Sequence, residues 1–483
     1  MTTPPGEGIE EEAFNEQRYK RLLERLEVSI QKLSECKNII DFRIDANTYR
    51  KDYLRTELFL NNRSCKTIDE LSISVQNFGA YSLCNFINFS DKGIPFLMTE
   101  NIRHNYIDWN IQKYVDDISH KMLYKSHCHK GQVLVTMAGE YLGRVAVYDK
   151  DFVCSSNQAI AKITLKEEIN PYTIATFLNT IYGQNQINRL KTLTGQPNIN
   201  MSLIKNLKIP DFSKEFSDTI EKIVNKSEET KEQSQILYRQ AEELLLETIG
   251  LKDFKPSEKG TNIKSFKESF LATGRLDAEY YQPKYEEIIN KIKSQPHDVL
   301  GNLVIIKKSI ESGSDVYVDE GLPFIRVSDY NKFGISTPEK CLSEKFCKEN
   351  TALLQSLYPT KDTILFSKDG SVGSAFMVRE NMQAVTSGAI LHLTVKDKSK
   401  ILPDYLTLAL NSEVVKQQAE RDAGGSIILH WRVGEIEKVV VPVVDSKIQQ
   451  QIAELIEKSF YLRRESGKLL EEAKEMVERE IEK

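Results

Sequence analysis

The sequence predicts an α+β (mixed α/β) protein with two repeated globular domains, separated and joined by long, paired, antiparallel α-helices. Two long stretches show helical apolar periodicity, and the globular segments before them match each other in order. Inside each globular segment, short apolar runs alternate with polar loops, as expected for β-strands. These three observations set the fold class.

The first helical stretch covers residues 213–250 and has no proline and no glycine before Gly250. Its apolar stripe consists of Phe216, Ile220, Val224, Tyr238, Ala241 and Leu245. Glu, Lys, Gln and Ser fill most positions between these residues, which is typical of an amphipathic helix. At 1.5 Å per residue the helix would be roughly 55 Å long, too long for one compact core, so we interpret it as a spacer.

A second helical stretch covers residues 443–483 and repeats the first with a shift of 232 positions. Its stripe consists of Ile448, Ile452, Ile456, Leu470, Ala473 and Val477. Neither helix can bury its stripe alone, so we expect the two to pack together. The alternative is two unrelated helical tails.

The repeat extends upstream of both helices. Residues 43–46 (RIDA) recur as 275–278 (RLDA), and residues 93–96 (GIPF) recur as 321–324 (GLPF). The order of the matches is kept, whereas chance matches would scatter. The expected domains are a tip and helix over 1–41, globular domains over 42–212 and 275–442, the helices 213–250 and 443–483, and a connector over 251–274.

Each globular domain has the same expected plan of strands followed by helix and loop. The first domain has apolar runs at 71–75, 95–98, 133–136, 145–148 and 159–165, then one or two helices over 171–190. The second has runs at 303–307, 323–327, 364–367, 375–378 and 389–395, then a helix over 402–420. Upstream of both, residues 10–38 show near-heptad spacing that predicts one more helix, and residues 1–8 are expected to be disordered.

Bulk composition narrows the class of protein. The net charge is −5, while residues 42–212 carry 20 Lys and Arg against 16 Asp and Glu. Any DNA contact therefore needs local basic clusters rather than overall charge. The seven cysteines are never in CxxC spacing, no apolar run reaches 18 residues, and the N-terminus lacks signal-peptide features. We expect a cytoplasmic protein with free thiols and no membrane span.

Catalytic signatures are missing from the sequence. It has neither the GxxxxGK[ST] loop of an NTP motor nor a GxGxxG nucleotide loop. Residues 170–172 (NPY) lack a proline of the NPPY motif of amino-methyltransferases and open a helix. His120, His127 and His129 with Cys128 invite a zinc interpretation, but no second ligand pair stands at structural spacing. We expect no metal site and no catalytic residues.

Two glycine-containing loops in each domain are the candidate binding sites. Residues 136–143 match 367–373 at a strand end, and residues 194–200 match 424–432. Amide side chains can read adenine edges, hydroxyl and basic groups can donate to phosphates or bases, and an aromatic ring can stack. The candidate DNA contacts are Thr136, Met137, Gly139, Gln196, Asn198, Asn200, Ser367, Lys368, Asp369, Gly370, Ser426, His430, Trp431 and Arg432. The alternative is that these residues only form turns that stabilise the fold.

Taken together, these features resemble the specificity (S) subunit of Type I restriction–modification enzymes. The resemblance covers nearly all of residues 42–483. It rests on the repeat, the strand-then-glycine loops (GQVLVTMAGEYLG and DTILFSKDGSVG), the loops before IP or VP, the paired helices, and RLDAEYYQPKYEEI before the second domain.

The resemblance implies that each globular domain is a target recognition domain that reads one half of a split, asymmetric double-stranded DNA site. The helices would set the half-site spacing and dock two DNA methyltransferase (modification) subunits. Those partners would bind S-adenosylmethionine and methylate adenine N6, and a restriction/translocase subunit would join to cut DNA. The chain itself would have no cofactor and no catalysis, and would serve phage defence.

Two features depart from the family pattern. The predicted helix over 10–38 precedes the first domain, and Trp431 with Arg432 replaces small polar residues in the second loop. Three other functions stay open on sequence alone: a diverged nuclease or methyltransferase, a DNA-targeting subunit of another defence or modification system, and a protein-binding scaffold.

Overall fold

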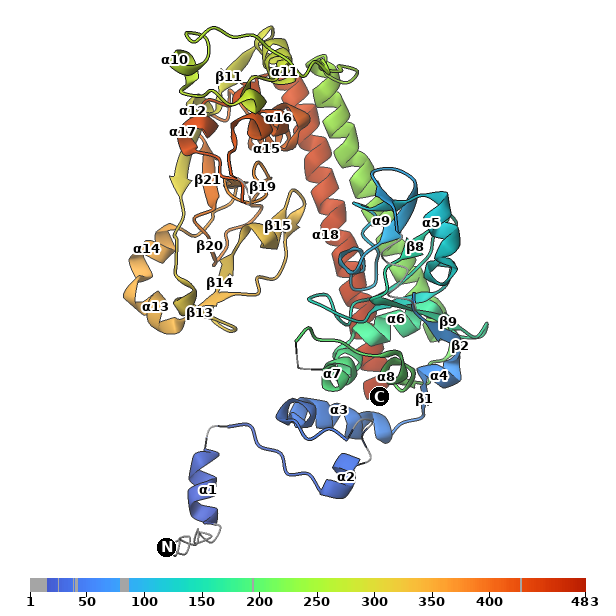
Figure 1. Cartoon of the computed structure of the whole chain (residues 1–483). Helices are drawn as coiled ribbons and strands as arrows, with labels where there is room; N and C mark the ends of the chain where they lie inside the picture. Colours follow the sequence, from blue (N-terminus) through green and yellow to red (C-terminus); the bar gives the residue numbers. More distant parts are fainter. Residues whose placement is uncertain are drawn as a thin grey trace, which may run out of the picture. The chain divides into compact units, whose positions relative to one another are not determined.

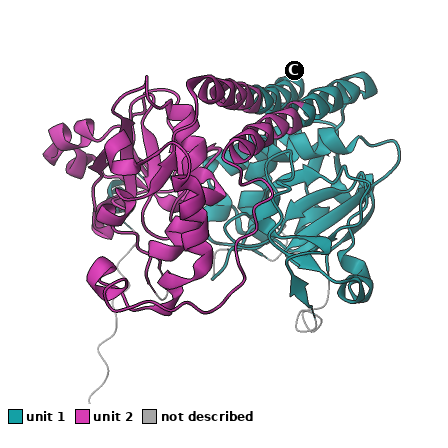
Figure 2. Ribbon diagram, turned by 90° about the horizontal axis from the view of Figure 1, so that it is seen from above, with its two compact units in different colours: residues 1–229, 465–483 teal, residues 230–464 magenta. Residues whose placement is uncertain are grey.

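The computed structural model describes residues 15–24, 26–37, 39, 42–78, 87–192, 195–425 and 428–483. The tip over residues 1–8, expected to be disordered, lies outside the described residues. The chain divides into two compact units, coloured in Figure 2. Unit 1 comprises residues 1–229 and 465–483, and unit 2 comprises residues 230–464.

Two long helices pack against each other within each unit. Helix α9 spans Lys214–Thr248 and α18 spans Ser446–Glu482, and they run side by side in Figure 1. In unit 1 the buried Ser227 Oγ lies 2.9 Å from Ser466 Oγ. In unit 2 Ser459 Oγ donates to Ser234 O at 2.8 Å. Since position numbers rise along one helix as they fall along the other, the pair is antiparallel.

The predicted apolar stripes lie in two separate cores. Ile220, Val224, Ala473 and Val477 are buried in the core of unit 1, and Phe216 and Leu470 pack against it. Tyr238, Ala241, Leu245, Ile452 and Ile456 are buried in the core of unit 2, and Ile448 packs against it. Each helix thus contributes one half of its stripe to each unit, which explains why both stripes are long.

Unit 1 contains two four-stranded sheets. The first has the order β2-β9-β6-β7 and is antiparallel throughout. The second has the order β3-β5-β4-β8, with β4 and β8 parallel. The strands are β2 Ser72–Gln76, β3 Phe89–Ser90, β4 Ile94–Leu97, β5 Tyr114–Val115, β6 Val133–Thr136, β7 Val145–Val147, β8 Ser155–Ser156 and β9 Ile160–Leu165. A short pair, β1 Cys65–Thr67 with β10 Lys208–Pro210, closes the unit.

Unit 2 repeats this topology strand for strand. Its sheets have the orders β12-β21-β18-β19 and β13-β17-β14-β20, and β14 pairs with β20 in parallel. The strands are β12 Val304–Lys308, β13 Tyr317–Val318, β14 Leu322–Ile325, β17 Cys341–Leu342, β18 Ile364–Ser367, β19 Ala375–Met377, β20 Val385–Thr386 and β21 Ile390–Val395. The closing pair is β11 His297–Val299 with β22 Val440–Pro442, and a hairpin joins β15 Tyr330–Asn331 to β16 Gly334–Ile335.

The helix after the sheets is broken at the same place in both repeats. Unit 1 has α6 Pro171–Asn179 and α7 Ile181–Leu190, and unit 2 has α15 Pro403–Asn411 and α16 Glu413–Asp422. At the break, Asn179 Nδ2 donates to Val145 O and Asn411 Nδ2 donates to Ala375 O, both at 2.8 Å. A single helix over 402–420 is therefore wrong, because this asparagine bonds to the neighbouring strand at the turn.

Shorter helices complete the units. In unit 1 they are α3 Lys51–Asn61, α4 Ile68–Leu71, α5 Asp117–Met122 and α8 Met201–Lys205. In unit 2 they are α10 Phe270–Thr273, α11 Pro283–Lys293, α12 Leu300–Leu303, α13 Glu344–Glu349, α14 Thr351–Ser356 and α17 Val433–Ile436. No helix in these described ranges is long and apolar enough to cross a membrane.

The single helix predicted over residues 10–38 is wrong in its described part. Two short helices, α1 Glu16–Leu22 and α2 Leu33–Lys37, flank a non-helical stretch. Leu26 and Ile30 are 64% and 92% exposed, so these two residues of the apolar stripe face solvent rather than a core. Without such packing a short helix is marginal in water. The predicted α+β class, with two repeats and a paired long-helix spacer, is confirmed.

Candidate nucleic-acid interface

In unit 1 the two candidate loops are joined by backbone pairing. Ala138 and Asn198 form an antiparallel bridge. Gly139 N donates to Pro197 O at 3.0 Å, and Ile199 N donates to Met137 O at 2.8 Å. Loops that are 60 residues apart in sequence therefore form one surface.

Gly139 is required at this junction for two reasons. Its φ of +84° lies in the left-handed region that side chains rarely adopt. A Cβ at this position would also lie 2.9 Å from Gln196 Nε2, so the glutamine amide rests directly over the glycine. The glycine thus admits an amide from the second loop.

A polar hollow of about 430 Å³ opens beside the joined loops. Its lining includes the predicted residues Gly139 and Gln196. It also includes three polar residues that sequence reasoning missed, namely Thr99, Asn157 and Gln158. The position of Asn157 and Gln158 at the loops depends on β8 pairing with β4.

Several candidate side chains in unit 1 hold the loops rather than face solvent. Thr136 is fully buried, and its Oγ1 accepts from Arg144 N at 2.8 Å. Met137 is buried in the core of the unit. Asn200 Oδ1 accepts from Leu203 N at 2.9 Å and caps α8. The assignment of Thr136 and Met137 as DNA contacts is therefore wrong, while Gln196, Asn198 and Asn200 remain exposed.

Unit 2 joins its loops in the same way but with charged side chains. Asp369 and His430 form the equivalent bridge, and Gly370 N donates to Leu429 O at 2.9 Å. His430 Nδ1 lies 2.8 Å from Asp369 Oδ1, and Lys368 Nζ forms an ion pair with the same carboxylate. Gly370 has a φ of +72°. The bridge position therefore carries amide chemistry in unit 1 and an acid–base cluster in unit 2.

The remaining unit 2 candidates divide between core and surface. Ser367 is fully buried and its Oγ accepts from Ser374 N at 2.9 Å. Trp431 is 1% exposed and belongs to the hydrophobic core. Both are therefore corrected from DNA contacts to fold residues, because their side chains point away from the surface. Arg432 and His430 are exposed, and Ser426 lies outside the described residues.

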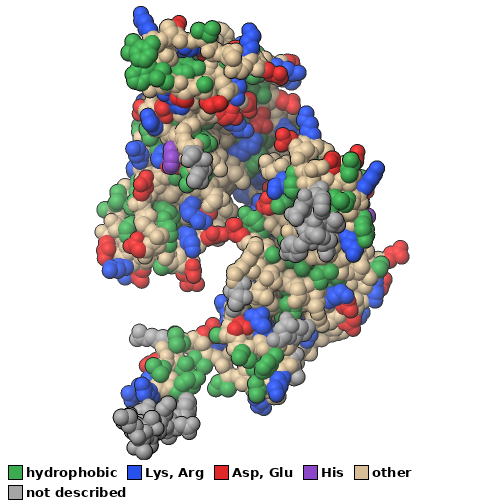
Figure 3. All heavy atoms as spheres, in the orientation of Figure 1, with side chains coloured by type: hydrophobic (Ala, Val, Ile, Leu, Met, Phe, Trp, Pro, Cys, Tyr) green, Lys and Arg blue, Asp and Glu red, His purple; other side chains and the backbone are tan. Residues whose placement is uncertain are grey.

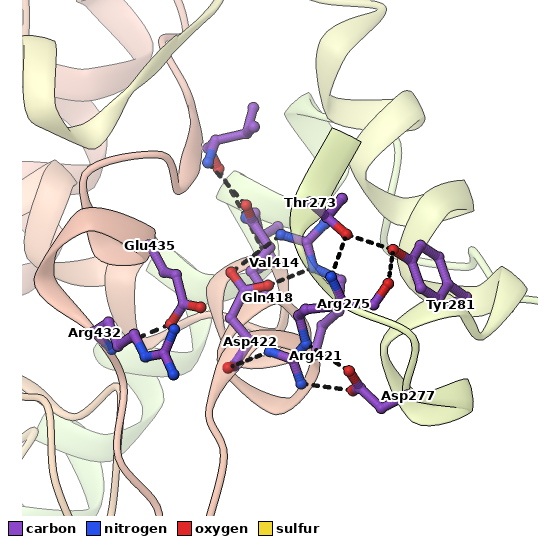
Figure 4. Close-up of polar contacts among 11 residues, drawn as sticks. Thr273, Arg275, Asp277, Tyr281, Val414, Gln418, Arg421, Asp422, Arg432 and Glu435 are labelled. Atoms are coloured by element: carbon purple, nitrogen blue, oxygen red, sulfur yellow. Dashed lines mark hydrogen bonds and ion pairs between the residues drawn. The ribbon is translucent and has the colours of Figure 1, made fainter. Parts of the chain in front are cut away.

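In each unit an arginine binds the helix end from which the second loop departs, and Figure 4 shows this clasp in unit 2. Arg275 donates to Asp277 Oδ1 at 2.8 Å and to Asp422 O, at the end of α16, at 2.9 Å. The hydrogen bond from Arg275 lowers the pKa of the Asp277 carboxyl. In unit 1, Arg43 makes the equivalent contacts to Asp45 at 2.6 Å and to Lys191 O at 3.0 Å. This explains the repeated Arg-Ile/Leu-Asp-Ala motif.

Two arginines of unit 1, Arg103 and Arg144, lie close to each other. Burial and the neighbouring Arg103 lower the pKa of Arg144, whose guanidinium lies 4.2 Å from the centre of the Tyr141 ring. Arg144 Nη1 is buried without a hydrogen-bond partner among the described residues. On the face shown in Figure 3, by contrast, basic and acidic side chains are interspersed. A guanidinium next to a loop can donate to a phosphate.

The histidine-rich segment of unit 1 is packed rather than arranged as a metal site. The rings of His120 and His127 stack with their centroids 3.7 Å apart. His120 Nδ1 lies 2.7 Å from Ser155 Oγ, and burial lowers the pKa of His120. No group of three His, Cys, Asp or Glu residues suited to a metal ion occurs in the part of the chain that the structure describes.

Comparison with protein families now identifies the chain. A family model described as the Type I restriction modification DNA specificity domain matches residues 30–234 and 299–474. The chain belongs to this family. Each matched segment contains the two four-stranded sheets of one unit, so the family model covers both repeats. Its described role is DNA specificity in restriction–modification.

The chain is also similar to solved structures. The chain is 17% identical to the S subunit of a Type I restriction–modification system from M. genitalium, with 86% of this chain and 94% of that chain covered and a TM-score of 0.40. It is 13% identical to the HsdS subunit from Thermoanaerobacter tengcongensis, with 86% and 95% covered and a TM-score of 0.29. No curated protein matches the chain.

Proposed function

We propose that this chain reads DNA sequence for a Type I restriction–modification complex, and that each unit reads one half of a split, asymmetric site. One observation carries the proposal. The two units build the same loop junction on the same topology, yet place different side chains on it, at Ala138 and Asn198 in unit 1 and at Asp369 and His430 in unit 2. Two domains that read different DNA sequences require a shared scaffold with different side chains at the loop junction.

The long helices suit a spacer and a docking platform. Helix α9 has 35 residues, which corresponds to ~50 Å and exceeds the ~35 Å of one duplex turn. We assign the exposed faces of α9 and α18 to two DNA methyltransferase subunits, which would carry S-adenosylmethionine and methylate adenine N6. A restriction/translocase subunit would add cleavage. The chain itself would supply binding and spacing without catalysis, in the cytoplasm, as part of phage defence.

The test is to co-express this chain with the adenine methyltransferase encoded beside it and to map N6-methyladenine across the host genome. The proposal predicts a split motif that is methylated on both strands and disappears when this chain is omitted. Absence of new methylation, with an intact complex that binds S-adenosylmethionine, would contradict a modification role. A DNA-targeting or scaffold role would then take its place.

A further inference from the structure

The polar hollow of unit 1 has the chemistry of a base-reading site. Amides from two separate loops, Gln158 and Gln196, line it together with the hydroxyl of Thr99 and the carboxylate of Glu140. A carboxylate repels phosphate, and the lining contains no Lys or Arg. The hollow is therefore suited to the uncharged edge of a base rather than to the DNA backbone, whose charge better fits Arg144 nearby.

We propose that Gln158 and Gln196 of this hollow read an adenine in the half-site of unit 1, an inference that rests on the proposed function. A carboxamide offers one donor and one acceptor side by side. Adenine presents the complementary pair, the N6 amino group and N7, in the major groove. Carboxylates cannot donate to N7, and lysine or arginine cannot accept from N6, so an amide is the fitting reader.

The backbone that carries Gln158 is held firmly before any ligand arrives. Asn157 N donates to Leu97 O at 2.9 Å, and Asn157 Oδ1 accepts from Ala159 N at 3.2 Å. On the other side, Asn77 Nδ2 donates to Gln158 O at 3.3 Å. Asn157 is 8% exposed, so it is a positioning residue, whereas Gln158 is partly exposed and lines the hollow. A fixed support lowers the entropy cost of forming a bidentate contact.

Gln196 enters the hollow from the second loop. Its side chain is exposed, and its amide nitrogen lies over Gly139, where any Cβ would displace it. The bridge between Ala138 and Asn198 holds this loop against the first. Two amides from independent supports thus face one hollow, so each is expected to contribute to the same base position or to adjacent positions.

Unit 2 has different chemistry at the equivalent place. The position of Gln158 is taken by Gly388, and a Cβ there would lie 2.3 Å from Glu311 Cγ, so the Glu311 side chain covers the glycine. The position of Ala138 is taken by Asp369, which is paired with Lys368 and His430. Among the described residues, unit 2 thus lacks the counterpart of Gln158, and loss of the unit 1 amides should leave the other half-site unchanged.

The experiment maps N6-methyladenine with the co-expressed complex carrying Gln158→Ala, Gln196→Ala or Gln158→Glu. Each alanine variant should reduce discrimination at an A·T position by roughly tenfold to a hundredfold, in one and the same half of the motif. Gln158→Glu keeps the shape of the side chain and should shift preference from adenine toward cytosine, whose N4 amino group donates to a carboxylate. Gln112→Ala, an exposed glutamine of unit 1 outside the hollow, is the matched control and should keep the parental motif.

The unaffected half-site serves as an internal control for folding and assembly. A split motif that all three variants leave unchanged would overturn this inference while the proposed function stands. Relaxation at a position that is not an A·T pair, or in different halves for Gln158 and Gln196, would also overturn it. If the parental complex yields no split motif, the proposed function itself fails, so the two failures are distinguishable.

Discussion

Replacement of Trp431 by alanine should destabilise unit 2 strongly. The indole is 1% exposed and lies 5.8 Å from the Phe366 ring, between centroids, inside the core formed by β18, β21 and α16. Deleting such a buried aromatic side chain costs about 3–5 kcal/mol. Because whole domains are stable by only about 5–15 kcal/mol, this is a large share of the total.

Trp431→Phe separates packing from polar effects. The indole Nε1 is buried and has no hydrogen-bond partner among the described residues. A buried donor without a partner costs about 1–3 kcal/mol, so phenylalanine regains part of what the smaller ring loses. We expect Trp431→Phe to change the free energy of unfolding by less than about 1.5 kcal/mol. Leu429→Ala, on the same loop and 40% exposed, should cost less than about 1 kcal/mol.

The assay is differential scanning calorimetry combined with amide hydrogen exchange of β18 and α16. Trp431→Ala should lower the unit 2 transition and the protection of both elements. A stability loss below about 1 kcal/mol together with loss of DNA recognition would refute the assignment of Trp431 to the core and restore a stacking role.

Three further predictions follow from buried or strained positions. Burial lowers the pKa of His392 to about 4, so the unfolded chain takes up a proton before the folded chain does as pH falls from about 6.5 to 4. The free energy of unfolding should therefore drop by up to about 3 kcal/mol over this range. His392→Gln, whose side chain can still bond Thr386, should remove this loss in urea titrations at each pH. Ser227→Leu should overpack α9 against α18 and lower the free energy of unfolding by roughly 1–3 kcal/mol, measured by thermal unfolding. Ser227→Ala should lower it by only about 1 kcal/mol, and equal losses for the two variants would contradict tight packing at this position. Gly139→Ala should cost about 1–2 kcal/mol by the same measurement, and no change would show that the left-handed turn is dispensable.

The sequence predicted the parts of the fold that local pattern controls. The stripes of α9 and α18, for example at Ile220 and Ile452, follow directly from helical periodicity. The loop that contains Gly139 was predicted because it comes directly after the apolar run of residues 133–136. In each case the residues that carry the signal are neighbours along the chain.

Features that depend on tertiary contacts escaped sequence reasoning. Trp431 follows the polar His430, and nothing local shows that its ring turns into the core. Gln158 reaches the hollow only because β8 pairs with β4, and the break after Asn411 depends on a bond to β19. The heptad pattern upstream of Leu33 failed for the opposite reason, since Leu26 and Ile30 of the stripe are exposed.

The central claim is that two independent readers share one chain. It is tested most directly by replacing residues 42–212 with the matching domain of a relative of known specificity and mapping N6-methyladenine with the parental methyltransferase. The account predicts that one half of the split motif changes to that of the donor, while the other half and the spacing remain. A change in both halves, or in neither, with the complex intact, would contradict it.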